Sequence, residues 1–208
     1  EDQTCTVLDG VYKRTGKINI VSAGRTEGIT LNIGFDNSEA YSAWKAKKLN
    51  SITLPSISGG TVSGLMSSIN WFFTDSHEDF AIFQIVVKND SKDGTYYPQY
   101  INRITLDSNG EYALCYQART ETLLINDTPT ETSLPEGYGV APFLYVHRVL
   151  DFIFSEFGYT ITENPFKTDK ELSSLVILNN AADCCVTGIL NYADLMPDCT
   201  IEDFLNAL

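Results

Sequence analysis

The sequence has few of the features that would place a protein in a membrane or on a nucleic acid. No stretch of about 18 consecutive apolar residues occurs, so no segment is expected to span a bilayer. Basic residues are scarce: 14 lysines and arginines stand against 27 aspartates and glutamates, a formal net charge of −13. Residues 45–48 hold the densest basic stretch, with three lysines, and are interpreted as a solvated polar flank. A negative field repels phosphate groups, so we expect neither nucleic acid nor a membrane surface as a partner.

The sequence is equally poor in catalytic signatures. It has two histidines, His77 and His147, and neither lies in a recognised nucleophile motif such as GxSxG. Residues 58–61 contain two glycines but lack the lysine of a phosphate-binding loop, and no dinucleotide fingerprint occurs. Carboxylate pairs are too abundant to single out a catalytic pair. The sequence therefore predicts a protein that is not an enzyme, with no catalytic residue and no cofactor.

Cysteine use argues against both a disulfide scaffold and a metal centre. The five cysteines are Cys5, Cys115, Cys184, Cys185 and Cys199. Their number is odd, and neither a CxxC pair nor a Cys/His ligand set is present. We therefore expect reduced, mostly buried thiols and no metal site.

What the chain does have is enough apolar and aromatic material for a folded core. Hydrophobic residues make up 43% and aromatic residues 12% of the sequence, which excludes a disordered chain. Residues 11–12, 17–21 and 28–34 show the apolar alternation or β-branched enrichment of three short strands, and Gly16, Gly24 and Gly28 are interpreted as the turns between them. This spacing predicts an antiparallel meander or a small barrel. Short helices are expected at residues 38–48 and 64–73.

The middle of the chain continues the β pattern. Residues 80–87 give the strongest strand signal, and their composition predicts a strand that is buried on both faces. Residues 100–106 and 111–116 are predicted to form two strands joined through an Asn-Gly turn. Residues 127–139, rich in Thr, Pro and Gly, are interpreted as a loop.

Beyond this loop the hydrophobic period changes to that of a helix. Apolar side chains recur at helical spacing from Phe143 to Phe157, and Gly158 is suited to the C-terminal cap. Residues 172–178 fit either a helix end or a strand. Thr200 and Asp203 resemble a capping box that begins a last helix.

Together these patterns predict an α+β fold, with an antiparallel β-rich, barrel- or meander-like N-terminal part followed by a helical C-terminal part. Residues 1–126 are predicted to form a β-rich domain with one or two short helices. Residues 127–208 are predicted to be mainly helical. Because the apolar stripe of the last helix still runs at Leu208, we expect this region to continue in a longer parent protein.

Three blocks of the C-terminal third carry a resemblance to a known group of proteins. They are Pro142–Tyr159, with the sequence PFLYVHRVLDFIFSEFGY, then Leu175–Asn180, LVILNN, and Ile189–Leu205, which contains LMPDCTIEDFL. The chain thereby resembles tail-associated structural proteins of phages and prophages of anaerobic gut bacteria. The strand pattern at Gly16–Ile20 and the Ile-Asn-Arg step at 101–103 occur in the expected order.

The resemblance implies a structural component of a tail or baseplate, made in the bacterial cytoplasm and incorporated into the virion tail. Such a component builds β-barrel modules with inserted helices into a multimer, with other tail or baseplate proteins or further copies of itself as partners. Exposed aromatic side chains would form the contacts, since interface cores favour them. The candidates are Trp44, Trp71, Tyr96 and Tyr97, for which ordinary core packing is the competing interpretation.

Two other functions stay open at this point. The acidity, the aromatic content and the β content also suit a secreted or surface module that binds carbohydrate or another ligand. A hydrolase with an unobvious site would require an apolar pocket with two convergent carboxyl groups.

Overall fold

The structure is a computed structural model that describes residues 3–9, 12–24, 28–35, 44–69, 77–87, 99–125 and 128–208. The chain divides into two compact units. The first comprises residues 1–47 and 200–208, and the second comprises residues 48–199. The boundary that the sequence suggests between residues 126 and 127 stays a prediction.

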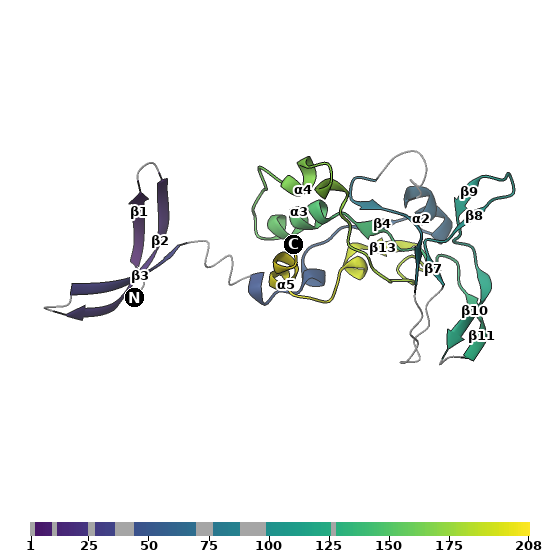
Figure 1. The fold of residues 1–208 in the computed structure, drawn as a ribbon, viewed down its shortest axis with the longest axis horizontal. Helices are drawn as coiled ribbons and strands as arrows, with labels where there is room; N and C mark the ends of the chain where they lie inside the picture. The colour runs from purple at the N-terminus through teal and green to yellow at the C-terminus, as the bar shows by residue number, and fades with distance from the viewer. Residues whose placement is uncertain are drawn as a thin grey trace. The chain divides into compact units, whose positions relative to one another are not determined.

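The first unit contains a three-stranded antiparallel meander (Figure 1). Strand β1 (Gln3–Asp9) pairs with β2 (Tyr12–Gly24), which pairs in turn with β3 (Gly28–Phe35). The β2–β3 register shifts between Ile20 and Ser22, the mark of a β-bulge. The strands predicted at 17–21 and 28–34 exist and are longer than the sequence pattern suggested. The predicted turn at Gly16 is wrong, because β2 runs from Tyr12 through Gly16 without a break, and β1 was not predicted.

The same unit contains the last helix, α5 (Ile201–Asn206). The Thr200 side chain accepts a hydrogen bond from the Asp203 backbone N–H, and the Asp203 carboxylate accepts one from the Thr200 backbone N–H. This is the predicted capping box, and it satisfies two backbone donors of the first turn.

The central helix of the second unit is α3 (Val146–Glu156), which the helical spacing predicted. Its inner face is buried and consists of Val146, Val149, Leu150 and Ile153. Gly158, at φ +76°, ends it: its N–H bonds to Ser155 O at 3.0 Å, and Tyr159 N–H bonds to Phe154 O at 2.9 Å. These two bonds form a Schellman motif, so the predicted glycine cap is confirmed.

A short β layer precedes α3. Strand β5 (Phe80–Ala81) pairs with β12 (Phe143–Leu144), and residues 175–177 run along the other side of β12. Leu175 O accepts from Val146 N at 2.9 Å, and Ile177 N donates to Leu144 O at 2.8 Å. The helix therefore starts later than Phe143, because Phe143 and Leu144 lie in a strand that is fully buried.

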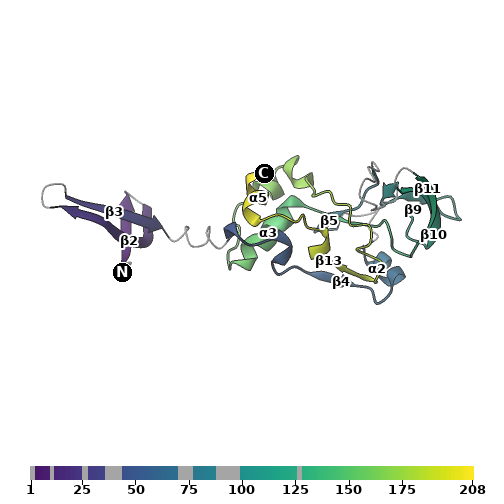
Figure 2. The ribbon, with the colours of Figure 1, turned by 90° about the horizontal axis from the view of Figure 1, so that it is seen from below.

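A second β layer joins distant parts of the sequence. Strand β4 (Ser56–Ser58) pairs with β13 (Ile189–Asn191) beside helix α2 (Val62–Ile69), as both ribbon views show (Figure 2). Gly188, at φ +74°, allows this close approach, since a Cβ atom there would lie 2.6 Å from the Thr61 carbonyl carbon. Helix α2 confirms residues 64–69 of the helix expected at 64–73 and begins two residues earlier, while residues 70–73 lie outside the described residues.

The described residues of the second unit also include short helical elements. They are the 3₁₀ turns η1 (Leu49–Ser51), η2 (Leu172–Ser174) and η3 (Tyr192–Leu195), and helix α4 (Pro165–Thr168).

Asn102 connects three segments of the second unit at its centre. Its side chain is fully buried, and its backbone lies in the left-handed region at φ 55°. The Asn102 Oδ1 accepts from Ala141 N at 2.8 Å, while its Nδ2 donates to Ala141 O at 2.8 Å and to Phe83 O at 3.2 Å. The amide thus acts as a piece of strand backbone between residues that no continuous sheet joins.

The predicted layout of the fold is wrong. Small antiparallel strand pairs recur along the described chain, and strands β11 (Thr128–Leu134), β12 and β13 lie in the part expected to be helical. The described residues therefore form a mixed α/β structure with few helices. The sequence-based division assumed that one hydrophobic period holds over a long region, whereas short strands and helices alternate here.

Two local predictions are also wrong. Residues 80–87 do not form one buried strand: β5 ends at Ala81, β6 (Ile85–Val86) pairs with β7 (Tyr100–Ile101), and Val86 is 70% exposed. Residues 127–139 are not all loop, since β11 occupies residues 128–134. A proline is tolerated in β11 because a two-stranded sheet consists only of edge strands.

In the described residues, no helix has the length and apolar character needed to cross a membrane.

Candidate functional site

Two hairpins lie together at the end of the second unit away from α3 (Figures 1 and 2). The first joins β8 (Ile104–Leu106) to β9 (Tyr112–Leu114). The second joins β10 (Arg119–Ile125) to β11 and is called the arm below. In the part of the chain that the structure describes, neither hairpin pairs with a third strand. Two-stranded sheets are marginally stable on their own in water, so their anchoring needs an explanation.

The β8–β9 turn is held by its own side chain. Asp107 Oδ1 accepts hydrogen bonds from Asn109 N at 2.8 Å and from Glu111 N at 2.9 Å. These bonds from Glu111 and Asn109 lower the pKa of the Asp107 carboxyl. Gly110, at φ +80°, completes the Asn-Gly turn that the sequence predicted. The turn is therefore ordered while it stands in solvent.

This ordered turn exposes an apolar pair. Leu106 and Tyr112 are direct cross-strand partners, so their side chains lie on one face of the hairpin. They are 62% and 65% exposed, respectively. We call Leu106 and Tyr112 the tip pair. Exposed apolar side chains that lie side by side, rather than scattered singly, mark protein contact sites.

The two faces of the arm differ in environment. The inner face carries every second residue of β10: Arg119, Glu121 and Leu123. The Leu123 side chain there is 2% exposed. The outer face is exposed and polar, with Thr120, Thr122, Glu131 and Ser133. Most of β11 is exposed, so the arm shows one buried face and one solvent-facing face.

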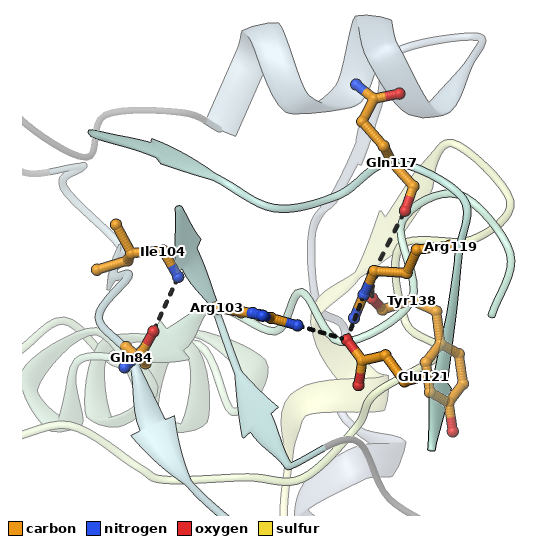
Figure 3. A network of polar contacts seen from close by, with 7 residues as sticks. All are labelled: Gln84, Arg103, Ile104, Gln117, Arg119, Glu121 and Tyr138. Atoms are coloured by element: carbon orange, nitrogen blue, oxygen red, sulfur yellow. Dashed lines mark hydrogen bonds and ion pairs between the residues drawn. The ribbon is translucent and has the colours of Figure 1, made fainter. Parts of the chain in front are cut away.

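A network of arginines and one glutamate anchors the base of the arm (Figure 3). The Glu121 Oε1 accepts from Arg119 Nε at 2.5 Å and from Arg103 at 3.1 Å. Arg119 also donates to Tyr138 O at 3.1 Å and to Gln117 O at 3.4 Å. The Arg119 and Glu121 side chains are 14% and 13% exposed, whereas Arg103 is 41% exposed. The inner pair is shielded from water, so it fixes the arm more strongly than a surface ion pair would.

A second polar cluster surrounds Asp79, and hydrogen bonds within the protein occupy both of its carboxylate oxygens. Asp79 Oδ1 accepts from Arg148 Nε at 2.5 Å, and Asp79 Oδ2 accepts from the Tyr192 hydroxyl at 2.9 Å. Arg148 also donates to Asp151 at 3.4 Å. Burial and the hydrogen bond to Asp79 raise the pKa of Tyr192, so the phenol stays protonated. Both carboxylate oxygens of Asp79 are bound, and this arrangement links α3 to the β layers.

The two histidines belong to packed surroundings. His77 Nδ1 accepts from Asp79 N at 3.1 Å, and its ring stacks on Phe80 with centroids 3.9 Å apart. The His147 ring stacks on Tyr145 at 5.3 Å. Burial lowers the pKa of both imidazoles, which favours their neutral forms.

The adjacent cysteines are buried thiols in contact with each other. Cys184 and Cys185 Sγ atoms lie 3.8 Å apart, and Cys184 donates to Val140 O at 3.2 Å. The hydrogen bond with Cys185 and burial raise the pKa of Cys184, so its thiolate is suppressed. Within the described residues, no three His, Cys, Asp or Glu side chains are placed to hold a metal ion.

The structure describes one of the four aromatic residues that the sequence predicted as interface contacts. Trp44 is half-buried in the first unit, and its Nε1 is shielded from solvent. Trp71, Tyr96 and Tyr97 lie outside the described residues. The tip pair was not singled out from the sequence. The Asn-Gly turn gave the signal, because it placed Leu106 and Tyr112 opposite each other at the end of a hairpin.

Comparison of the chain with protein-family models, with curated proteins and with solved structures finds no match.

Proposed function

We propose that this chain is a non-enzymatic structural component that assembles with other proteins through its two hairpins. The observation that carries the proposal is the tip pair: two large apolar side chains exposed on a turn that the Asp107 hydrogen bonds hold in place. A monomer gains nothing from this exposure, whereas a partner that covers both side chains gains about 25 cal/mol per Å² of buried apolar surface.

The arm supports the same function in a different way. Its inner face is fixed by Glu121 and the two arginines, its outer face is exposed, and among the described residues no further strand pairs with β10 or β11. A projecting hairpin can contribute edge hydrogen bonds to a neighbouring sheet, a frequent mode of protein association. The arm therefore supplies backbone contacts and the β8–β9 hairpin supplies apolar ones.

The chemistry of the described residues agrees with a role that depends on surfaces. The Asp79 oxygens are both bound, the Cys184 thiolate is suppressed, and His77 is held by a ring stack and a backbone hydrogen bond. Each of these groups is engaged in interactions within the fold.

The setting that we propose is the tail or baseplate of a phage or prophage-derived particle. The C-terminal blocks at 142–159, 175–180 and 189–205 carry this part of the proposal, through their resemblance to tail-associated proteins. The partners would be other tail or baseplate proteins or further copies of this chain.

Immunogold electron microscopy on particles induced from the source strain tests the setting. With an antibody to this chain, we expect gold at the tail tip or baseplate. Gold on the cell envelope with unlabelled tails would contradict the tail assignment and favour the surface-binding module.

A further inference from the structure

The two hairpins of the second unit carry an excess of negative charge. Residues 103–139 hold six acidic and two basic residues, and no lysine. Both basic residues are arginines, and both are bound to Glu121. Asp107 and Glu111 are exposed and stand next to the tip pair in the sequence, and Glu131 is exposed on the outer face of the arm. The apolar tip pair is therefore surrounded by carboxylates.

Strand β2 and the residues on either side of it carry the opposite charge. Residues 10–26, called the basic segment below, contain Lys13, Arg14, Lys17 and Arg25 and no acidic residue. The whole chain, in contrast, has 27 acidic and 14 basic residues. The charges of this chain are thus separated along the sequence, with cations concentrated in β2 and anions in the hairpins.

The other stretch rich in lysine is already engaged within the fold. At residues 45–48, Lys45 Nζ lies 3.6 Å from the Glu202 carboxylate and Lys48 Nζ lies 2.6 Å from that of Asp198. These lysines are therefore balanced by nearby carboxylates, whereas the basic segment includes no carboxylate of its own.

The basic segment also brings apolar residues together. The β2–β3 register pairs Ile18 with Ile33 and Ile20 with Leu31, so these four residues share one face of the ribbon. Apolar residues beside lysines and arginines are the chemical complement of an apolar pair surrounded by carboxylates.

We propose that the acidic hairpins of one copy bind the basic segment of a second copy, so that copies of this chain associate head to tail. The proposal rests on the proposed function and names the partner there. A contact between two different surfaces of one chain is heterologous, and it builds rings or open chains.

The charges favour this contact over a hairpin-to-hairpin one. A symmetric contact between tip pairs would place Asp107 and Glu111 of each copy against the same residues of the other, and like charges at an interface cost several kcal/mol. The net charge of −13 repels two copies at long distance. At physiological salt, however, screening limits this repulsion to about 8 Å, so the surfaces in contact decide.

Sedimentation velocity of the purified chain at roughly 5–200 μM tests the proposal, since this range detects micromolar dissociation constants. Each copy has two binding surfaces, so we expect species larger than a dimer that grow with concentration. Raising NaCl from about 50 mM to about 500 mM should lower the association constant at least about tenfold, because salt screens exposed charges.

Charge reversal identifies the two surfaces. Glu111→Lys/Glu131→Lys reverses the hairpins, Lys13→Glu/Lys17→Glu reverses the basic segment, and each variant alone should stay monomeric. An equal mixture of the two should associate again, because each surface then meets its opposite charge on the other variant. A hairpin-to-hairpin contact predicts instead that Lys13→Glu/Lys17→Glu associates like the original chain.

The matched control is Glu163→Lys/Glu171→Lys, which changes the net charge equally at exposed sites outside the hairpins and should associate like the original chain. Circular dichroism checks folding, and if the variant in β2 does not fold, the hairpin variant and this control decide. The proposal is overturned if the original chain stays monomeric, if the mixture does not associate, or if the control loses association equally. A monomeric chain whose position 112 cross-links to a different tail protein would overturn this inference and leave the proposed function intact.

Discussion

Asn102 shows how much of the second unit depends on one side chain. It occupies a left-handed backbone conformation, which asparagine tolerates better than most residues, and its amide satisfies both backbone groups of Ala141. The same amide also donates to Phe83 O, so one side chain joins residues 83, 102 and 141.

Replacing Asn102 should separate its two contributions. Asn102→Ala leaves the Ala141 N–H and C=O buried without partners and places alanine in a left-handed conformation that asparagine tolerates better, so the free energy of unfolding should fall by about 3–5 kcal/mol. Asn102→Gly removes the same hydrogen bonds without the strain and should lose about 1 kcal/mol less. Urea denaturation measures both, and a loss below about 1 kcal/mol for Asn102→Ala would contradict the role of the amide.

The histidines predict a stability that depends on pH. Burial lowers the pKa of His77 and of His147 below the ordinary value of 6.5, so the unfolded chain binds protons more tightly than the folded one. This stability is fully present above pH 6.5 and is lost as the pH falls below it toward the lowered folded pKa values. Urea denaturation at several pH values should show the decrease, and the His77→Gln/His147→Gln chain should show a flatter profile. Identical profiles for the original chain and the variant would contradict the assignment of this pH dependence to the two histidines.

At the scale of elements, local signals were predictable and long-range pairings were not. The α3 period, the Gly158 cap and the Thr200 capping box depend on residues within a few positions of each other, and each is present. The division of 80–87 into β5 and β6 depends on distant partners, β12 and β7, that no local pattern announces. The sequence predicts a loop where β11 lies, because threonines and a proline also suit turns.

For the candidate sites, too, local features were predictable from the sequence and long-range ones were not. The turn of the β8–β9 hairpin could be predicted from Asn109 and Gly110, but the exposure of Leu106 and Tyr112 depends on where the hairpin stands in the fold.

The arm should lose its anchor when Glu121 is replaced. Glu121→Ala leaves the shielded Arg119 guanidinium without its carboxylate, so the free energy of unfolding should fall by about 2 kcal/mol and the arm amides should exchange faster with solvent. Arg103→Ala is the matched control, because this half-exposed arginine should contribute only about 0.5 kcal/mol. Hydrogen exchange of residues 119–134 measures the effect, and equal protection in both variants would show that Glu121 does not anchor the arm.

At the scale of the whole molecule, the tip pair should matter for assembly and little for folding. The Leu106→Ser/Tyr112→Ser chain should lose less than about 1 kcal/mol of unfolding free energy, because both side chains are already exposed. Its incorporation into particles should nevertheless fall strongly. Leu178→Ser, at a 59% exposed site outside the hairpins, is the control and should be incorporated normally. Normal incorporation of the double variant would remove the tip pair from the assembly surface.

Photo-cross-linking in the assembled particle tests the central claim, that the hairpins are assembly surfaces, most directly. p-Benzoylphenylalanine would replace Tyr112 on the β8–β9 hairpin, Thr122 on the outer face of the arm, or Leu178 as the exposed control. The account predicts cross-links from positions 112 and 122 to another tail protein or a second copy of this chain, and none from position 178. Cross-links from position 178 alone, or from no position in particles that contain the chain, would contradict it.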